Sequence, residues 1–186
     1  ELPGSDGSAK VFLEAIKRSG IIEQDAQKNI IDVKDPVWCA SGDSILAVFP
    51  DDEFRVSYTL SYPGIGMQFF SAVIDEVTFE REIAPARTFC SEAEAAELLK
   101  RGLGRGANYE NTLVMGPGGP INNTLRFPDE PVRHKVLDLI GDLYIAGRSV
   151  KGHVVAIKSG HKLNMELVKI LLSQKGDHDG RCGAGH

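Results

Sequence analysis

The pattern of apolar and polar positions predicts one helix at the start of the chain and then a series of short strands. From Ser8 to Ser19 the apolar residues recur at helical spacing, and Gly20 follows as a C-cap. Five β-branched or alternating runs come next, each bounded by Gly, Pro or Asp. They cover residues 29–33, 37–39, 44–49, 54–60 and 68–73. Their close spacing predicts a mostly antiparallel sheet and not a doubly wound one.

The middle of the chain predicts a small unit of a different kind. Residues 91–101 have the composition of a strong helix, and Ser91 with Glu94 three residues later forms a capping box at its start. Residues 111–115 predict a short strand, and a turn-rich loop follows at 116–120. We therefore expect a strand–helix–strand insert over about residues 88–115.

The last third of the chain predicts helix, strand and helix. Residues 131–145 form a long apolar-periodic segment with Pro131 in the first turn. A strand is expected at 153–157, and a final helix at about 163–172. The fold class that follows is α+β: a two-layer α/β sandwich, with a mostly antiparallel sheet, helices packed on one face and the small insert.

Charge and composition narrow the range of partners. The chain has 186 residues, a net charge of -5 and basic residues scattered along its length. A protein that neutralises a phosphate backbone needs a concentrated basic surface, so we expect no nucleic-acid partner. A small anionic ligand needs only one or two local cations and stays possible.

Cysteine usage and the lack of targeting segments indicate a cytoplasmic protein. Cys39, Cys90 and Cys182 are far apart and include no CxxC pair, which suits a reducing compartment better than a disulfide framework. No apolar run approaches the ~20 residues of a transmembrane segment, and the chain has no secretory signal pattern. It begins at Glu1, without Met, so we expect further residues before it.

Three polar residues on the predicted helix 131–145 could carry chemistry. A step of four residues advances about 400° around a helix, so His134, Asp138 and Asp142 share one edge. His134 and Asp138 can converge on one ion, because imidazole and carboxylate both bind zinc. Spacing alone favours a solvated helix face. The apolar opposite face indicates a packed helix, yet periodicity leaves the two interpretations open.

Other candidates have structural alternatives of their own. His161 follows Gly160 between a predicted strand and a helix, where a tight turn can approach a ligand, although a capping role is the simpler reading of a lone Gly-His pair. Thr88 and Phe89 can equally mark the end of a strand. The turn Asp6-Gly7-Ser8 is best explained structurally, with Ser8 as the N-cap of the first helix.

Five stretches of the sequence together resemble one enzyme family. They are ELPGSDGSA, ARTF, RGLGRGANYENTLV, LRFPDEPVRHKVLDLIGDL and KSGHKLN, in this order from Glu1 to about Leu172. They are similar to the UDP-3-O-acyl-N-acetylglucosamine deacetylases, zinc amidases that catalyse the committed step of lipid A biosynthesis. The resemblance implies a hydrolase with Zn2+ as cofactor and an acylated UDP-sugar as substrate.

The resemblance also implies roles for individual residues. His134 and Asp138 match two of the three zinc ligands. His161 matches the catalytic histidine, an electrostatic stabiliser or general acid, with Asp142 orienting it. Lys135 and Thr88 match catalytic and substrate-contacting residues. Phe89 is expected to bind substrate, where the insert forms an apolar passage for an acyl chain.

The family's general base and third zinc ligand, a Glu–His pair, lie in a first domain and have no counterpart in this sequence. We therefore expect residues 1–20 to end that domain or link it to the next, and residues 21–174 to form the second domain. Residues 175–186 read as a disordered tail or a cloning remnant. The resemblance predicts that this chain alone is inactive; a non-catalytic domain that binds an acylated nucleotide sugar or a partner protein is the alternative.

Overall fold

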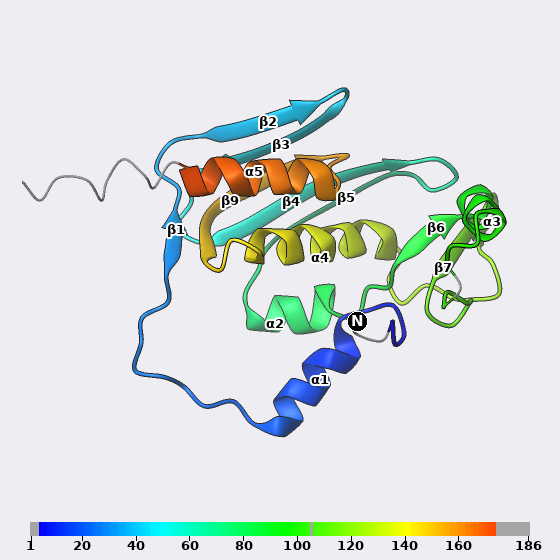
Figure 1. Ribbon diagram of the computed structural model, residues 1–186, viewed down its shortest axis with the longest axis horizontal. Helices are drawn as coiled ribbons and strands as arrows, with labels where there is room; N and C mark the ends of the chain where they lie inside the picture. Colours follow the sequence, from blue (N-terminus) through cyan, green and yellow to red (C-terminus); the bar gives the residue numbers. More distant parts are fainter. Residues whose placement is uncertain (1–3, 105, 174–186) are drawn as a thin grey trace, which may run out of the picture.

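A mixed β-sheet and two long helices on one of its faces form the main body of the protein (Figure 1). The computed structural model describes residues 4–104 and 106–173. Its helices are α1 (Lys10–Ser19), α2 (Glu76–Thr78), the π-helix η1 (Phe79–Ile83), α3 (Glu92–Lys100), α4 (Glu130–Tyr144) and α5 (His161–Ser173). Its strands are β1 (Ile30–Asp32), β2 (Val37–Ser41), β3 (Ser44–Phe49), β4 (Phe54–Tyr62), β5 (Gly66–Val73), β6 (Phe89–Ser91), β7 (Leu113–Gly116), β8 (Gly119–Pro120) and β9 (Ser149–Ile157).

The order of the strands explains how distant parts of the chain meet. The sheet runs β2-β3-β9-β4-β5, so the late strand β9 lies between the early strands β3 and β4. The pairings β2–β3, β3–β9 and β4–β5 are antiparallel, whereas β4 and β1 run parallel to β9. The predicted α+β class with a mostly antiparallel sheet is confirmed, but the parallel pairing of β9 had no local signal.

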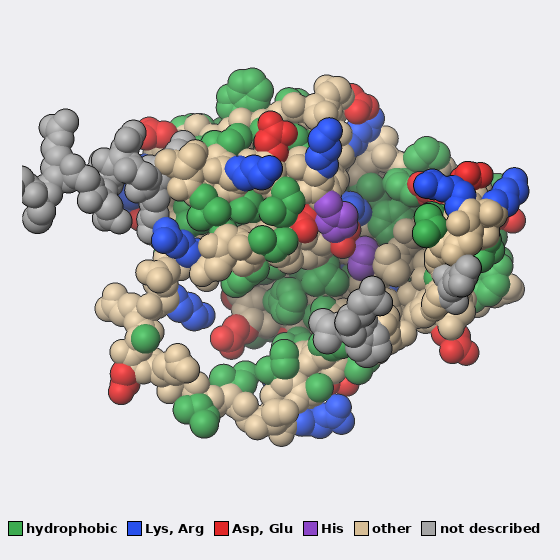
Figure 2. Space-filling view, in the orientation of Figure 1, with side chains coloured by type: hydrophobic (Ala, Val, Ile, Leu, Met, Phe, Trp, Pro, Cys, Tyr) green, Lys and Arg blue, Asp and Glu red, His purple; other side chains and the backbone are tan. Residues whose placement is uncertain are grey.

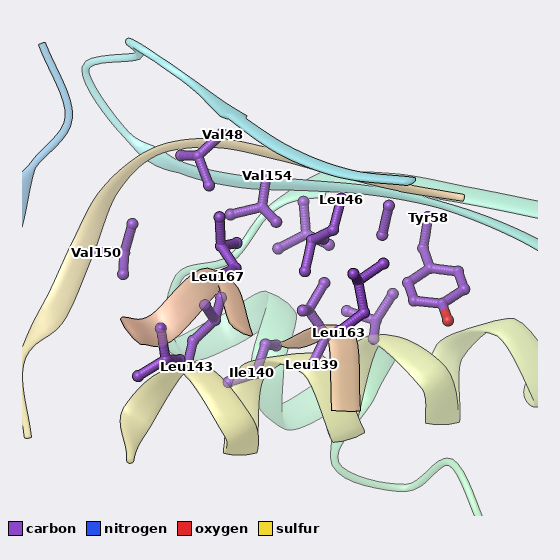
Figure 3. Close-up of a cluster of buried hydrophobic side chains, with 14 of the residues drawn as sticks. Leu46, Val48, Tyr58, Leu139, Ile140, Leu143, Val150, Val154, Leu163 and Leu167 are labelled. Carbon is purple, nitrogen blue, oxygen red and sulfur yellow. The ribbon is translucent and has the colours of Figure 1, made fainter. Parts of the chain in front are cut away.

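The core lies between the sheet and the helices α4 and α5 (Figure 3). Alternate residues of β9 are buried, because successive side chains of a strand point to opposite faces. The core side chains labelled in the figure come from strands (Leu46, Val48, Tyr58, Val150, Val154) and from helices (Leu139, Ile140, Leu143, Leu163, Leu167). Burying one such side chain contributes about 1.5–3 kcal/mol. This packing fixes the orientation of α4, and with it the direction of its polar edge.

The predicted insert is present at one end of the molecule (Figure 1). β6 and β7 pair in parallel around α3, and the capping box of Ser91 and Glu94 is formed. The prediction of a loop at 116–120 is wrong in one respect, because β8 pairs with β7 as a third strand. A two-residue strand has no periodicity that could reveal it.

Several predicted boundaries shift. α1 begins at Lys10 with Ala9 as its N-cap residue, so Ser8 is not the N-cap, although its hydroxyl accepts a hydrogen bond from the backbone N–H of Lys10. α5 begins at His161 and not at Leu163, and the segment α2–η1 was not predicted. The tail expected at 175–186 lies outside the described residues. Within residues 4–104 and 106–173, no helix has the length and hydropathy needed to span a membrane.

Candidate active site

The polar edge of α4 presents His134, Asp138 and Asp142 on successive turns, as the spacing predicted. The opposite side of the helix is buried against the sheet, so this edge cannot rotate away. Asp138 lies at the centre of the group. Its Oδ1 is 3.4 Å from His134 Nε2, and its Oδ2 is 2.8 Å from Lys135 Nζ and 4.0 Å from His161 Nε2.

His134 is held as a neutral imidazole in one orientation. Its Nδ1 lies 3.0 Å from the carbonyl oxygen of Ala86. A carbonyl can only accept a hydrogen bond, so Nδ1 carries the proton and Nε2 keeps its lone pair. Burial lowers the pKa of His134, against the opposing effect of the Asp138 carboxylate. Near neutral pH the ring is therefore uncharged, with its free nitrogen directed at Asp138.

The spacing of this pair would allow two donors to hold one metal ion. Tetrahedral zinc has ligand distances of about 2.0–2.2 Å, which place two ligand atoms about 3.3–3.6 Å apart. The observed 3.4 Å between His134 Nε2 and Asp138 Oδ1 matches this spacing. Two ligands do not complete a site, and in the described part of the chain no three His, Cys, Asp or Glu side chains group to hold an ion.

The turn before α5 brings His161 to the same place. Tyr58, fully buried in β4, donates a hydrogen bond from its hydroxyl to the carbonyl of Ser159, and Ser44 Oγ donates to the carbonyl of Lys158 at 2.9 Å. Lys158 itself has a positive φ of 51°. The turn is thus tied to two strands of the sheet, and α5 starts at His161 in a fixed position.

Asp142 joins the two helices through His161. Its Oδ2 accepts a hydrogen bond from His161 Nδ1 at 2.8 Å and another from Asn164 Nδ2 at 2.8 Å. Asn164 is 1% exposed, so its amide holds the Asp142 carboxylate from the interior of the protein. The far nitrogen of His161, Nε2, lies 4.0 Å from Asp138 Oδ2, and the residue itself lines a separate hollow with Gly160 and Glu166.

A pocket of about 260 Å³, here called the polar pocket because charged side chains of α4 and of the turn before α5 line it, opens next to these groups. Figure 2 shows histidine side chains near the middle of this face, with acidic and basic side chains beside them. The pocket is lined by residues from the sheet (Tyr58, Leu60, Ser61, Tyr62), from the segment before and at β6 (Thr88, Phe89), from α4 (His134, Lys135, Asp138) and from the turn before α5 (Lys158, Ser159).

A second, apolar pocket of about 340 Å³ lies within the insert, and Thr88 and Phe89 line both pockets. Leu98, Leu99 and Leu103 contribute much of its wall. The ring of Phe89 stands edge-on to that of Tyr62 at 5.1 Å and to that of His134 at 6.3 Å. Phe89 therefore forms the boundary between a polar and an apolar compartment.

Cys90, in the same wall, is a weak candidate for chemistry. Burial raises the pKa of its thiol, and the nearby Glu94 raises the pKa further. The thiolate, which is the reactive form, is therefore scarce near neutral pH. Cys39 and Cys90 are both free, and Cys182 lies outside the described residues.

All seven residues that the sequence singled out come together at this place: His134, Lys135, Asp138, Asp142, His161, Thr88 and Phe89. The sequence reasoning missed the groups that position them, namely Tyr58, Ala86 and Asn164. Asn164 stood inside the motif KSGHKLN, which was the available signal for it. Ala86 contributes only a backbone carbonyl, for which the sequence holds no signal.

Comparison with known proteins places the chain in a family. A sequence model of the family described as UDP-3-O-acyl N-acetylglycosamine deacetylase matches residues 1–173. Similar relatives, each named UDP-3-O-acyl-N-acetylglucosamine deacetylase, include one from Chlamydia felis, 47% identical over 178 residues, which are 94% of this chain and 64% of the relative. One from Chlamydia abortus is 46% identical over 176 residues, 92% of this chain and 63% of the relative.

The chain thus spans less than two thirds of the length of these relatives. The matched region includes each of the seven residues described above. The family match over almost the whole chain agrees with the motif resemblance and with the confirmed α+β class. This chain belongs to the UDP-3-O-acyl N-acetylglycosamine deacetylase family.

Proposed function

We propose that this chain is the C-terminal part of a zinc-dependent deacetylase. The enzyme would hydrolyse the acetamide of UDP-3-O-acyl-N-acetylglucosamine, the committed step of lipid A biosynthesis, in the cytoplasm. The observation that carries the proposal is the convergence of His134 and His161 on Asp138 at the edge of the polar pocket, with Asp142 behind His161. Family membership supports the substrate class.

In this proposal His134 and Asp138 are two of three zinc ligands. A bound zinc ion would act as a Lewis acid on the acetyl carbonyl and lower the pKa of a coordinated water to about 7. Both donors suit this role: His134 is neutral, as a ligand must be, and Asp138 is a carboxylate. The third ligand and the general base would come from the part of the longer protein that this chain does not include.

The remaining groups of the site would stabilise charge and move a proton. Lys135 and Thr88 line the pocket, where they can donate hydrogen bonds to the developing oxyanion. His161, when protonated, can deliver the Nε2 proton to the departing amine. Asp142 accepts the hydrogen bond from Nδ1, so the imidazole keeps this orientation and its positive charge is countered.

The two pockets suit the two ends of such a substrate. Lys158, which also pairs with Asp43, lines the polar pocket and offers positive charge to a diphosphate group. The apolar pocket of the insert, with its leucine wall, suits an acyl chain. Thr88 and Phe89, shared by both, stand where the sugar would lie.

We further propose that residues 1–20 belong to the boundary with the N-terminal domain, and that residues 21–174 form the second domain. α1 is amphipathic and has no buried residue, and Ile21 and Ile22 after it are 72% and 90% exposed. Beside α4 an open hollow of about 670 Å³ has hydrophobic side chains in its wall, among them Phe54, Phe79 and Leu137. The missing domain would cover these surfaces.

The test uses the full-length protein, the 186-residue chain and the variants Asp138→Asn and Asp129→Asn. Asp129, the N-cap residue of the same helix, bonds Arg133 away from the pocket, so its variant is the matched control. We expect full-length protein to release acetate, to lose this activity on chelation and to regain it with zinc. Asp138→Asn should abolish zinc-dependent turnover, and the control should retain it.

The chain alone should be inactive, because a general base contributes about 10²–10⁴ in rate and a ligand is missing as well. Deacetylation by the isolated chain at the rate of the full-length protein would contradict this division of the site. Tight binding of the acylated nucleotide sugar by full-length protein, without any acetate release, would favour the non-catalytic alternative.

A further inference from the structure

Residues 84–88, here called the strap, connect η1 to β6 and run along α4. Ala84 and Ala86 are fully buried, and Arg87 is 5% exposed. The strap supplies the carbonyl of Ala86 to His134, and it carries Thr88 into the polar pocket. Whatever holds the strap in register with α4 therefore sets the orientation of the imidazole.

A buried ion pair fastens the strap to α4. The guanidinium of Arg87 and the carboxylate of Glu130 form two parallel contacts, Nε–Oε1 at 2.8 Å and Nη2–Oε2 at 3.1 Å, with Glu130 fully buried. The same carboxylate accepts the backbone N–H groups of Arg87 at 3.0 Å and Arg126 at 2.6 Å. Arg87 also donates to Asn123 Oδ1 and to the carbonyl of Thr124.

The strap and α4 are bonded in a single register. Ala86 and Arg87 are consecutive residues of the strap, and their partners His134 and Glu130 lie one helical turn apart on α4. A slip of the strap by one residue would break both bonds together. The ion pair and the imidazole contact are thus two points of one attachment.

The N-terminal turn holds the other edge of the strap. Thr88 N–H donates to the carbonyl of Gly7 at 2.8 Å, and Ala9 N–H donates to that of Ala84 at 2.9 Å. Gly7 has a φ of 78°, and a Cβ there would lie 1.9 Å from the carbonyl oxygen of Asn111. The strap is therefore bonded to this turn on one side and to α4 on the other.

We propose that Arg87 and Glu130 are positioning residues that fix the Nδ1–H tautomer and the direction of His134. The inference rests on the proposed function, because it assigns the consequence to zinc binding at His134 Nε2. A buried ion pair is weak evidence for stability, since apolar residues of similar volume often replace one without loss. Bidentate geometry, by contrast, defines an orientation, and here it defines that of the strap.

The test compares Arg87→Lys, which keeps the charge but loses the two-pronged contact, with Arg133→Lys. Arg133 is the matched control: it also lies in ion pairs on α4, with Asp129 and Glu82. Zinc affinity is measured in full-length protein by competition with a chromogenic chelator. The tautomer of His134 is measured in zinc-free protein by long-range ¹H–¹⁵N NMR. Steady-state assays on the acylated nucleotide sugar separate kcat from KM.

We expect Arg87→Lys to weaken zinc binding by about 10–100-fold, as for other partners behind a metal ligand. The His134 ring should then show a mixture of tautomers, and kcat should fall with little change in KM. Arg133→Lys should leave zinc affinity and tautomer as in the wild type, even if its Tm is lower. A single Nδ1–H tautomer and unchanged zinc affinity in Arg87→Lys would overturn the proposal.

Should Arg87→Lys fail to fold, Glu130→Gln carries the test with the same criteria. Its amide places N–H groups against the donors of Arg87 or Arg126, so the attachment is weakened without a loss of volume. Failure of the proposed function is a separate result. If the wild-type protein shows no deacetylation, the proposed function is ruled out. The tautomer of zinc-free His134 still decides the role of the ion pair.

Discussion

Two histidines meet at Asp138, and their surroundings differ in nearly every respect. The side chain of His134 is 11% exposed, and that of His161 is 68% exposed. His134 projects from the middle of α4 and donates to a backbone carbonyl, whereas His161 begins α5 and bonds a carboxylate. Both lie near the Asp138 carboxylate, but one imidazole is buried and bonded to a neutral carbonyl, whereas the other is open to solvent and bonded to a second carboxylate.

This difference separates two kinds of chemistry. A buried imidazole with a fixed tautomer keeps a lone pair for a metal ion, because burial opposes protonation. An exposed imidazole held by a carboxylate can take up and release protons and stay in one orientation. Substitutions at the two residues should therefore affect different quantities: zinc affinity for His134 and kcat for His161.

The largest effect is expected for His161→Ala in the full-length protein. We expect kcat to fall by about 10²–10⁴-fold, the usual contribution of a general acid. Zinc affinity should stay close to that of the wild type, because His161 Nε2 is 4.0 Å from Asp138 Oδ2 and does not support His134. Steady-state kinetics and chelator competition measure the two quantities. An unchanged kcat would remove His161 from the mechanism.

A smaller effect is expected for Asp142→Asn. The amide occupies the same volume but no longer counters a charge on His161, and we expect kcat to fall by about 10–100-fold. KM should change little, because Asp142 does not line the polar pocket. Asp129→Asn, at the N-cap of the same helix, is the control. Equal losses in both variants would indicate a general effect on α4 and contradict a specific role for Asp142.

The smallest effect concerns stability and pH in the zinc-free protein. The pKa of folded His134 is lowered, so below the ordinary value of about 6.5 the unfolded chain binds a proton that the folded protein does not. Stability therefore falls with decreasing pH in this window. His134→Gln removes this contribution. The Tm of the wild type should drop more steeply than that of the variant from about pH 8 to about pH 5. Parallel curves of Tm against pH would refute a contribution from His134.

Local signals were sufficient for most elements of the fold. The five early strands, α3 with its capping box and the long helix α4 all lie near their predicted positions, because each depends on neighbours within a few residues. The segments α2, η1 and β8 escaped prediction. They are short, and tertiary contacts form them where no apolar period exists.

The sequence by itself determined which residues share an edge of α4, since helical geometry places His134, Asp138 and Asp142 on successive turns. Their motifs also determined the family. Only the tertiary structure decided that β9 enters between β3 and β4, which carries His161 to Asp142, and that a carbonyl of the strap fixes the ring of His134. Such contacts join residues far apart in the chain, and their formation depends on packing of the whole core.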